Sequence, residues 1–140
     1  AYGLVGSEAN SVKPGKRPLS SMSPTFVEDE RGILILGTPG GSRIISMVLL
    51  GILDYTAKPE VDAQKIVAAP RFHHQYLPDR IEVEPEEFEP ELLAQLSSLG
   101  HKVDIAKRRW GNMQAVFFDK KTRQTQTGND PRGIGGLAWY

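Results

Sequence analysis

Apolar residues follow first a strand pattern and then a helix pattern in the first half of the chain. Thr25–Glu28 and 33–36 are short β-branched or apolar runs separated by a charged segment that ends in Gly32, which predicts two antiparallel strands joined as a hairpin. Because 33–36 contains no polar residue, we expect both of its faces to be covered, as in layered α/β proteins. The next apolar positions are spaced by one and three residues, which predicts a helix with Ser42 as its N-cap and its end near Tyr55. These positions are Ile44, Ile45, Val48, Leu49, Ile52 and Leu53.

Two further helices are predicted in the second half. Residues 59–69 have Pro59 in the first turn and are closed by Pro70. Residues 90–99 carry a leucine stripe and are followed by Gly100, which suits a C-cap. The leucines expected to face inward are Leu92, Leu93, Leu96 and Leu99.

The remaining pattern predicts short strands. Residues 80–84 alternate apolar and polar side chains, and 102–107 and 114–119 are also strand-like. A turn is expected at 120–123 and a Gly-rich tail over 128–140. With a strand-like opening at 1–6, the sequence predicts a mixed α/β chain of about six strands and three helices. No internal repeat or domain boundary is visible in residues 1–140.

Residues 6–24 predict a long loop, because they are rich in Gly, Ser and Pro and show no apolar period. Within it Ser20, Ser21 and Ser23 lie between Pro18 and Pro24. Proline restricts its own φ and the preceding residue, so these hydroxyls are held on an extended path. Rigid hydroxyls suit ligand binding, although an ordinary Ser/Pro loop has the same composition. No neighbouring general base marks any of these serines as a nucleophile.

The strongest local feature is the connection between the second strand and the first helix, Thr38-Pro39-Gly40-Gly41-Ser42. A helix N-terminus leaves backbone N–H groups unpaired, and glycine lets a ligand approach the backbone closely. Such a turn can hold an anion, including the oxyanion of an acyl-transfer intermediate. The alternative is a tight connection whose glycines only permit the turn, since neither the Walker spacing nor G-x-G-x-x-G is present.

Charge and hydropathy exclude two classes of partner. The chain has 17 Lys+Arg and 17 Asp+Glu, so it lacks the basic excess of proteins that bind nucleic acid. Its longest apolar run, 47–53, is far shorter than a membrane span. We therefore expect a soluble protein without a nucleic-acid partner and without a membrane span.

No metal site is predicted. The absence of Cys excludes disulfides, thiolate metal sites and a Cys nucleophile. His73 and His74 are adjacent on an extended segment, so their side chains should point to opposite sides and cannot share one ion. A run of five glutamates is expected to form a solvated face rather than an acid/base pair. These are Glu82, Glu84, Glu86, Glu87 and Glu89.

Three longer motifs, in this order, resemble the small subunit of the γ-glutamyltranspeptidases, also called glutathione hydrolases. They are GKRPLSSMSPT at 15–25, GTPGGSRII at 37–45 and APRFHHQ at 69–75, and the likeness extends from Tyr2 to Arg132. The resemblance implies part of a four-layer αββα N-terminal nucleophile hydrolase fold, matured by self-cleavage into a large and a small subunit. It also implies that no metal or organic cofactor takes part.

Two residue pairs match functional residues of that family. Ser20 and Ser21 match the serines that hydrogen-bond the α-carboxylate of the γ-glutamyl group, together with an Arg of the large subunit. Gly40 and Gly41 match the pair whose backbone amides form the oxyanion hole. Thr38 stands where relatives often have Ser, a difference that leaves these amides available.

The family's nucleophile has no match in this chain. In the family it is the Thr at the new N-terminus of the small subunit, and its own α-amino group serves as base. The chain begins at Ala1, inside the family's small subunit, so we expect this Thr, and the acidic group that holds the substrate's α-amino group, upstream of it. Residues 1–140 would then be the C-terminal part of the small subunit and an incomplete catalytic unit, with part of the cover of 33–36 coming from the other subunit.

The activity implied by the resemblance is transfer of the γ-glutamyl group from glutathione to the Thr, and then to water or to an amino-acid or peptide acceptor. A cephalosporin-acylase-like or polyglutamate-processing relative would take another acyl group, and the serine pair argues against it. A non-catalytic remnant of the fold is the alternative from a different class. The family's usual location implies a periplasmic or secreted protein.

Overall fold

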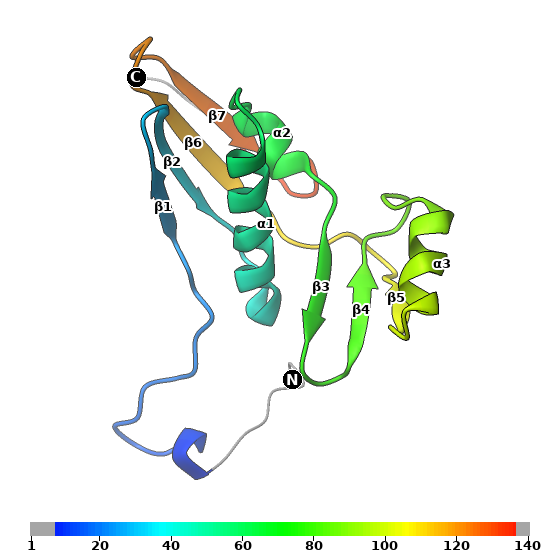
Figure 1. Cartoon of the computed structure of the whole chain (residues 1–140). Coiled ribbons are helices and arrows are strands. Elements are labelled where there is room, and N and C mark those ends of the chain that lie inside the picture. Colours follow the sequence, from blue (N-terminus) through cyan, green and yellow to red (C-terminus); the bar gives the residue numbers. More distant parts are fainter. Residues whose placement is uncertain (1–7, 137–140) are drawn as a thin grey trace.

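The computed structural model describes residues 8–136, which form two β-sheets with three α-helices (Figure 1). The described strands are β1 (Thr25–Glu28), β2 (Gly32–Gly37), β3 (Phe72–Gln75), β4 (Arg80–Val83), β5 (Val103–Ile105), β6 (Gln114–Asp119) and β7 (Thr125–Asn129). The helices are α1 (Ile44–Ala57), α2 (Ala63–Ala68) and α3 (Pro90–Ser98), with 3₁₀ turns η1 (Glu8–Asn10) and η2 (Gly41–Arg43). The predicted mixed α/β class is confirmed, and the strand-like opening at 1–6 lies outside the described residues.

The larger sheet has the order β1-β2-β6-β7, and every neighbouring pair in it is antiparallel. The predicted hairpin is confirmed, with Thr25 opposite Leu36 in β1 and β2. Helices α1 and α2 lie along one face of this sheet (Figure 1). Between helices and sheet lies the core, which includes Leu34, Leu36 and Phe117.

The other face of this sheet is uncovered among residues 8–136. Strand residues alternate between faces, so the neighbours of Leu34 and Leu36 point away from α1 and α2. Ile35 is 38% exposed, and its cross-strand neighbour Phe26 is 70% exposed. The expectation that both faces of 33–36 are covered therefore holds for one face among the described residues. Cover of the second face by another subunit stays a prediction.

Both helices on this sheet begin differently from the sequence prediction. Ser42 is not an N-cap, because it lies inside η2 and α1 starts at Ile44. Helix α2 starts at Ala63 rather than near Pro59, because the Asp62 carboxylate caps it by accepting the Lys65 N–H at 3.0 Å. Helix α1 buries only one part of its apolar surface, and Ile45, Leu49 and Leu53 remain exposed.

The smaller sheet has the order β3-β4-β5 and carries α3 (Figure 1). Strand β3 was not expected from the sequence pattern. Strands β4 and β5 are parallel, with α3 between them in the chain. Four leucines in and next to α3 were expected to face inward. Leu93 and Leu96 are half-buried, as expected. The prediction is wrong for Leu92 and Leu99, because both are exposed, Leu99 by 75%. The reason is that α3 packs against the short edge strand β5, which offers little surface to cover the helix. The C-cap of α3 is Leu99 rather than the expected Gly100. Gly100 follows it with a φ of 93°, the conformation in which glycine is common just beyond a helix.

The β1–β2 turn is built around Asp29. Its carboxylate accepts hydrogen bonds from the Arg31 side chain at 2.6 and 2.8 Å, from the Tyr55 hydroxyl at 2.7 Å, and from the Arg31 and Gly32 N–H groups. The hydrogen bond from the Arg31 side chain is the main reason that the pKa of Asp29 lies well below its usual range. Burial, together with the bond to Asp29, raises the pKa of Tyr55 to about 12.

We expect Asp29→Asn to destabilise the full-length protein at neutral pH but not in strong acid. The native pKa of Asp29 is depressed, so its carboxylate contributes stability that is fully present above the unfolded-state pKa of about 3.9. That contribution is lost as the pH falls through the native pKa. In thermal unfolding, the Tm difference between wild type and variant should shrink from about pH 5 downward. The neighbouring exposed Glu30→Gln is the control and should show no such trend, and a constant difference for Asp29→Asn would contradict the assignment.

Candidate active site

The serine loop (residues 18–24) and the glycine turn (residues 38–42) line one pocket. It has a volume of about 540 Å³ and brings together Ser20, Ser21 and Gly41, which come from two separate segments. Gly40 is the adjoining residue of the same turn. The other lining residues are Leu19, Met22, Thr38, Pro39 and Ile44. The two residue pairs predicted as site residues thus meet at one place in the fold.

The serine hydroxyls remain able to donate hydrogen bonds. Ser20 is exposed, and its Oγ accepts the Met22 N–H at 3.1 Å, which leaves the hydroxyl proton free. Ser21 is half-buried, and its Oγ makes no hydrogen bond to a residue in the described range 8–136. Its carbonyl accepts the Ser23 hydroxyl at 3.0 Å, which fixes the loop backbone. Two hydroxyl donors therefore line the pocket from one short segment of the chain.

The glycine turn has a backbone that needs glycine. Gly41 has a φ of 61° and Gly40 a φ of 157°, and a Cβ on Gly40 would collide with the Met47 side chain. The Gly40 carbonyl accepts the Arg43 N–H at 3.2 Å, and the Gly41 carbonyl accepts the Ile44 N–H. Within the described part of the chain, neither glycine N–H donates a hydrogen bond. The turn leads into the 14-residue helix α1, so two available amides lie at the positive end of a helix dipole.

Behind the turn lies a buried network of four charged side chains. Arg71 pairs with Asp130 at 2.8 Å, and Arg132 pairs with Glu84 at 2.5 Å and with Asp130 at 3.2 Å. Glu84 and Asp130 are 1% and 0% exposed. Burial opposes the charge of Asp130, but hydrogen bonds from the Arg132 and Met113 N–H groups and from the Arg71 guanidinium outweigh it, so the pKa of Asp130 is lowered.

The prediction that all five glutamates are solvated is therefore wrong for Glu84. Its carboxylate is satisfied by Arg132, 48 positions away in the chain, and by backbone N–H groups of Arg71 and Trp110. Glu82 and Glu87 are half-buried and form ion pairs with arginines. Only the exposed Glu86 and Glu89 fit the prediction. Arg71 lies in the motif at 69–75 and Arg132 at the end of the stretch that resembles the family, but nothing in the sequence indicates that they share one buried network.

The two histidines lie on opposite faces of β3, as predicted. His73 is buried, with Nδ1 2.8 Å from Ser46 Oγ and Nε2 2.9 Å from Gln75 Oε1. The exposed His74 has its Nε2 3.0 Å from Asp79 Oδ1. Among residues 8–136 no group of three or more His, Cys, Asp or Glu side chains could hold a metal ion. In the same range no helix is both long and apolar enough to cross a membrane.

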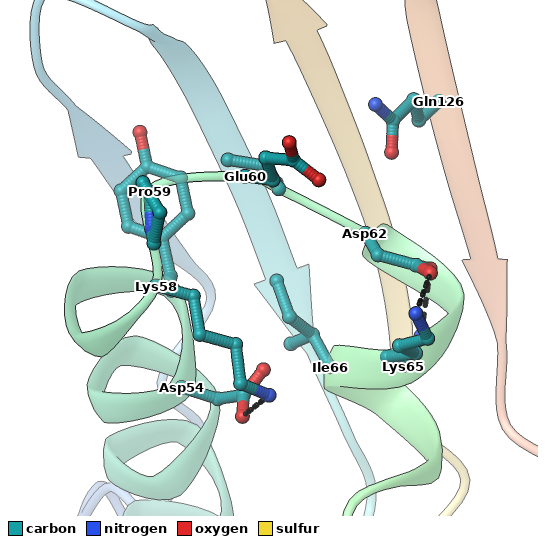
Figure 2. A pocket seen from close by; sticks show the side chains of 10 residues that line it. Asp54, Lys58, Pro59, Glu60, Asp62, Lys65, Ile66 and Gln126 are labelled. Atoms are coloured by element: carbon teal, nitrogen blue, oxygen red, sulfur yellow. Dashed lines mark hydrogen bonds and ion pairs between the residues drawn. The ribbon is translucent and has the colours of Figure 1, made fainter.

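A second pocket, of about 500 Å³, lies where α1 ends and α2 begins (Figure 2). Four of its charged side chains form two ion pairs, Lys58 with Asp54 at 2.5 Å and Lys65 with Asp62 at 3.2 Å. It contains none of the predicted site residues. The pocket of the serine loop and the glycine turn is therefore the candidate active site.

Comparison with known proteins agrees with the motifs. The family model of γ-glutamyltranspeptidase matches residues 1–140. The glutathione hydrolase proenzyme of Escherichia coli (strain K12) is 43% identical over 97% of this chain and 23% of its own length. That of Pseudomonas aeruginosa is 40% identical over 96% of this chain and 24% of its own length. The chain thus spans about a quarter of the length of these relatives.

Solved structures show the same fold. The γ-glutamyltranspeptidase of Pseudomonas nitroreducens in complex with L-DON is 36% identical, covers 100% of this chain and 73% of its own, and has a TM-score of 0.84. The transpeptidase CapD of Bacillus anthracis is 25% identical, covers 91% of this chain and 75% of its own, and has a TM-score of 0.77. The described sheets and helices are accordingly part of the four-layer αββα fold of N-terminal nucleophile hydrolases. Motifs, fold and the matched length together show that this chain belongs to the γ-glutamyltranspeptidase family.

Proposed function

We propose that this chain takes part in γ-glutamyl transfer and hydrolysis, with glutathione and related γ-glutamyl compounds as donors. The observation that carries the proposal is the single pocket lined by the paired serines and the glycine turn. A γ-glutamyl group carries an anionic α-carboxylate at one end and the reacting carbonyl at the other. Hydroxyl donors and free backbone amides on the two sides of one pocket suit these two ends.

In the proposed reaction, Ser20 and Ser21 donate hydrogen bonds to the α-carboxylate. The hydroxyl oxygen of a Thr outside this chain adds to the γ-carbonyl carbon, and its proton passes to that Thr's α-amino group. The carbonyl π electrons move to oxygen, and the N–H groups of Gly40 and Gly41 bind the resulting oxyanion. Collapse of this intermediate expels the donor's amine, which takes the proton. Water or an acceptor amine then adds to the acyl-enzyme in the same way. One oxyanion donor is worth about 2.7–4 kcal/mol.

The missing parts of this catalytic unit are proposed to come from the same precursor. The curated relatives named above are proenzymes. We infer that cleavage of a precursor produces a large subunit, which is the partner of this chain and contributes an Arg to carboxylate binding. The Thr nucleophile would lie upstream of Ala1 within the small subunit. No metal or organic cofactor has a step in this scheme, and the proposed location is periplasmic or secreted.

A polyglutamate-processing enzyme is the second candidate. It has less support, because the glutathione hydrolase of Escherichia coli is 43% identical to this chain, whereas the transpeptidase CapD is 25% identical. A cephalosporin-acylase-like activity has less support, because the serine pair Ser20 and Ser21 matches residues that hold the α-carboxylate of a γ-glutamyl group. A non-catalytic remnant would show no turnover of any γ-glutamyl donor.

The test is the double variant Ser20→Ala/Ser21→Ala in the matured full-length protein. It removes two hydrogen bonds to a charged carboxylate, each worth about 1.5–3 kcal/mol. We expect kcat/KM for a γ-glutamyl anilide to fall by at least about tenfold, mainly through KM, with Tm nearly unchanged.

A matched control is Ser97→Ala on α3, whose hydroxyl, among residues 8–136, bonds only to the Leu93 carbonyl of its own helix. This variant should keep wild-type kinetics. Wild-type kcat/KM in the double serine variant would remove Ser20 and Ser21 from substrate binding.

A further inference from the structure

The side chain of Thr38 connects the glycine turn to a separate segment of the chain. Its Oγ1 donates a hydrogen bond to the Pro39 carbonyl at 2.9 Å and accepts the Asn112 N–H at 3.1 Å. Strand β2 ends at Gly37, so neither bond belongs to a sheet ladder. The hydroxyl therefore has a fixed orientation, because its acceptor and donor roles are both occupied.

The bond to the Pro39 carbonyl determines where the Gly40 N–H points. The Pro39 carbonyl and the Gly40 N–H belong to the same planar trans peptide, in which C=O and N–H point in opposite directions. Holding the carbonyl oxygen therefore holds the N–H on the opposite side. In the described part of the chain this peptide makes no other hydrogen bond. Glycine rotates more freely about φ than other residues, so the peptide needs such a restraint.

The second amide of the turn is restrained by the backbone instead. The Gly40 carbonyl accepts the Arg43 N–H at 3.2 Å, and this carbonyl shares a peptide with the Gly41 N–H. Changing a side chain cannot remove that bond. Of the two amides, only that of Gly40 depends on a side-chain hydroxyl.

The Asn112 end of the contact is anchored in the buried charged network. Trp110 donates its N–H to Glu84 at 3.1 Å and accepts Arg71 Nη1 at its carbonyl at 2.8 Å. The Met113 N–H donates to Asp130 at 2.7 Å. The segment 110–113 is thus held on both sides of Asn112 by groups that cannot move independently. Through its bonds to Asn112 and Pro39, Thr38 links this segment to the glycine turn.

We propose that Thr38 is a positioning residue, whose hydroxyl orients the Gly40 N–H toward the oxyanion. The proposal rests on the proposed function, because it assumes that an oxyanion forms in this pocket. Thr38 touches no reacting atom in this scheme and acts only through the Pro39–Gly40 peptide. Its hydroxyl should matter for the transition state and not for ground-state binding.

The experiment compares Thr38→Val and Thr38→Ser in the matured full-length enzyme. Valine keeps the shape and removes the hydroxyl, and Thr38→Ala is a second variant without the hydroxyl in case the first does not mature. We expect kcat for a γ-glutamyl anilide to fall by about tenfold or more without the hydroxyl, since losing an oxyanion donor entirely costs about 10²–10³. Thr38→Ser should restore kcat to within about twofold of wild type. Thr56→Val removes an exposed hydroxyl that, within the described residues, bonds only to carbonyls of α1, and it should be neutral.

Ligand binding separates positioning from a general loss of structure. Affinity for glutamate should stay within about twofold of wild type in Thr38→Val. Affinity for a γ-boronic acid analogue, whose boron becomes tetrahedral when the nucleophile adds, should fall by about the same factor as kcat. Wild-type kcat and boronate affinity in Thr38→Val would overturn this inference alone, and so would a parallel loss of glutamate and boronate binding. A wild-type enzyme that turns over no γ-glutamyl donor would overturn the proposed function and this inference with it.

Discussion

Replacing Gly41 by valine should slow acylation by a γ-glutamyl donor by a factor of about 10² or more, while glutamate binds with similar affinity. Gly41 has a φ of 61°, which a β-branched residue adopts only with strain, and it lines the pocket where the acyl carbon must approach. The oxyanion exists only at and around the transition state, so the loss should appear in kcat more than in ground-state binding. Single-turnover acylation and glutamate titration of the matured enzyme measure the two effects separately.

Gly100→Val is the matched control for backbone strain. Gly100 also has a positive φ, 93°, with no atom within 4 Å of an added Cβ, and it lies at the end of α3 outside the pocket. This variant should lose some stability and keep its acylation rate. If acylation by Gly41→Val is unaffected, or if binding, rate and fold are lost together, the glycines serve only as a tight connection.

Glu84→Gln should destabilise the assembled protein by about 3–5 kcal/mol, the usual cost of breaking a buried ion pair from one side. The Glu84 carboxylate accepts two bonds from Arg132 and one from each of two backbone N–H groups, of Arg71 and Trp110. A glutamine offers one oxygen and turns an NH₂ group toward donors that are already there. Arg132 would keep only Asp130 as its buried counter-charge.

Denaturant or thermal unfolding of the full-length protein measures this effect. Glu86→Gln changes an exposed glutamate of the same run and should shift stability by less than about 0.5 kcal/mol. A shift of similar size in the two variants would mean that the network around Glu84 contributes no more than a surface charge does.

The sequence predicted those parts of the fold that depend on local pattern. The hairpin of β1 and β2 followed from two apolar runs around a charged turn, and α1 followed from its apolar spacing. The starts of α1 and α2 were misplaced because several nearby residues could begin each helix. The Asp62 carboxylate accepts a backbone N–H at the start of α2. The 3₁₀ turn η2 leads into α1, and Ser42 lies inside that turn rather than capping the helix. Strand β7 was missed because Thr125–Asn129 carries no apolar signal, and its strand conformation comes from pairing with β6.

The candidate site likewise has a part that the sequence predicted and a part that it did not. Ser20 and Ser21, and Gly40 and Gly41, stand in contiguous motifs, so residue order alone marked them. The buried charged network was not predictable, because Arg71, Glu84 and Arg132 are far apart in the chain and meet only in the folded state. Glutamates in a charged run normally face water, and a sequence gives no sign of a buried partner 48 positions away. The hydroxyl of Thr38 acquires its role only through Asn112, which the sequence places 74 positions later.

The most direct measurement is the position of bound glutamate in a crystal structure of the matured full-length protein. The account predicts that its α-carboxylate lies within hydrogen-bond distance, about 2.5–3.2 Å, of the Ser20 and Ser21 hydroxyls. It also predicts that a γ-carboxylate oxygen, the counterpart of the reacting carbonyl oxygen, lies within the same distance of the Gly40 and Gly41 N–H groups. Glutamate bound with its α-carboxylate away from both serines, or with its γ-carboxylate away from both glycine amides, would contradict the account.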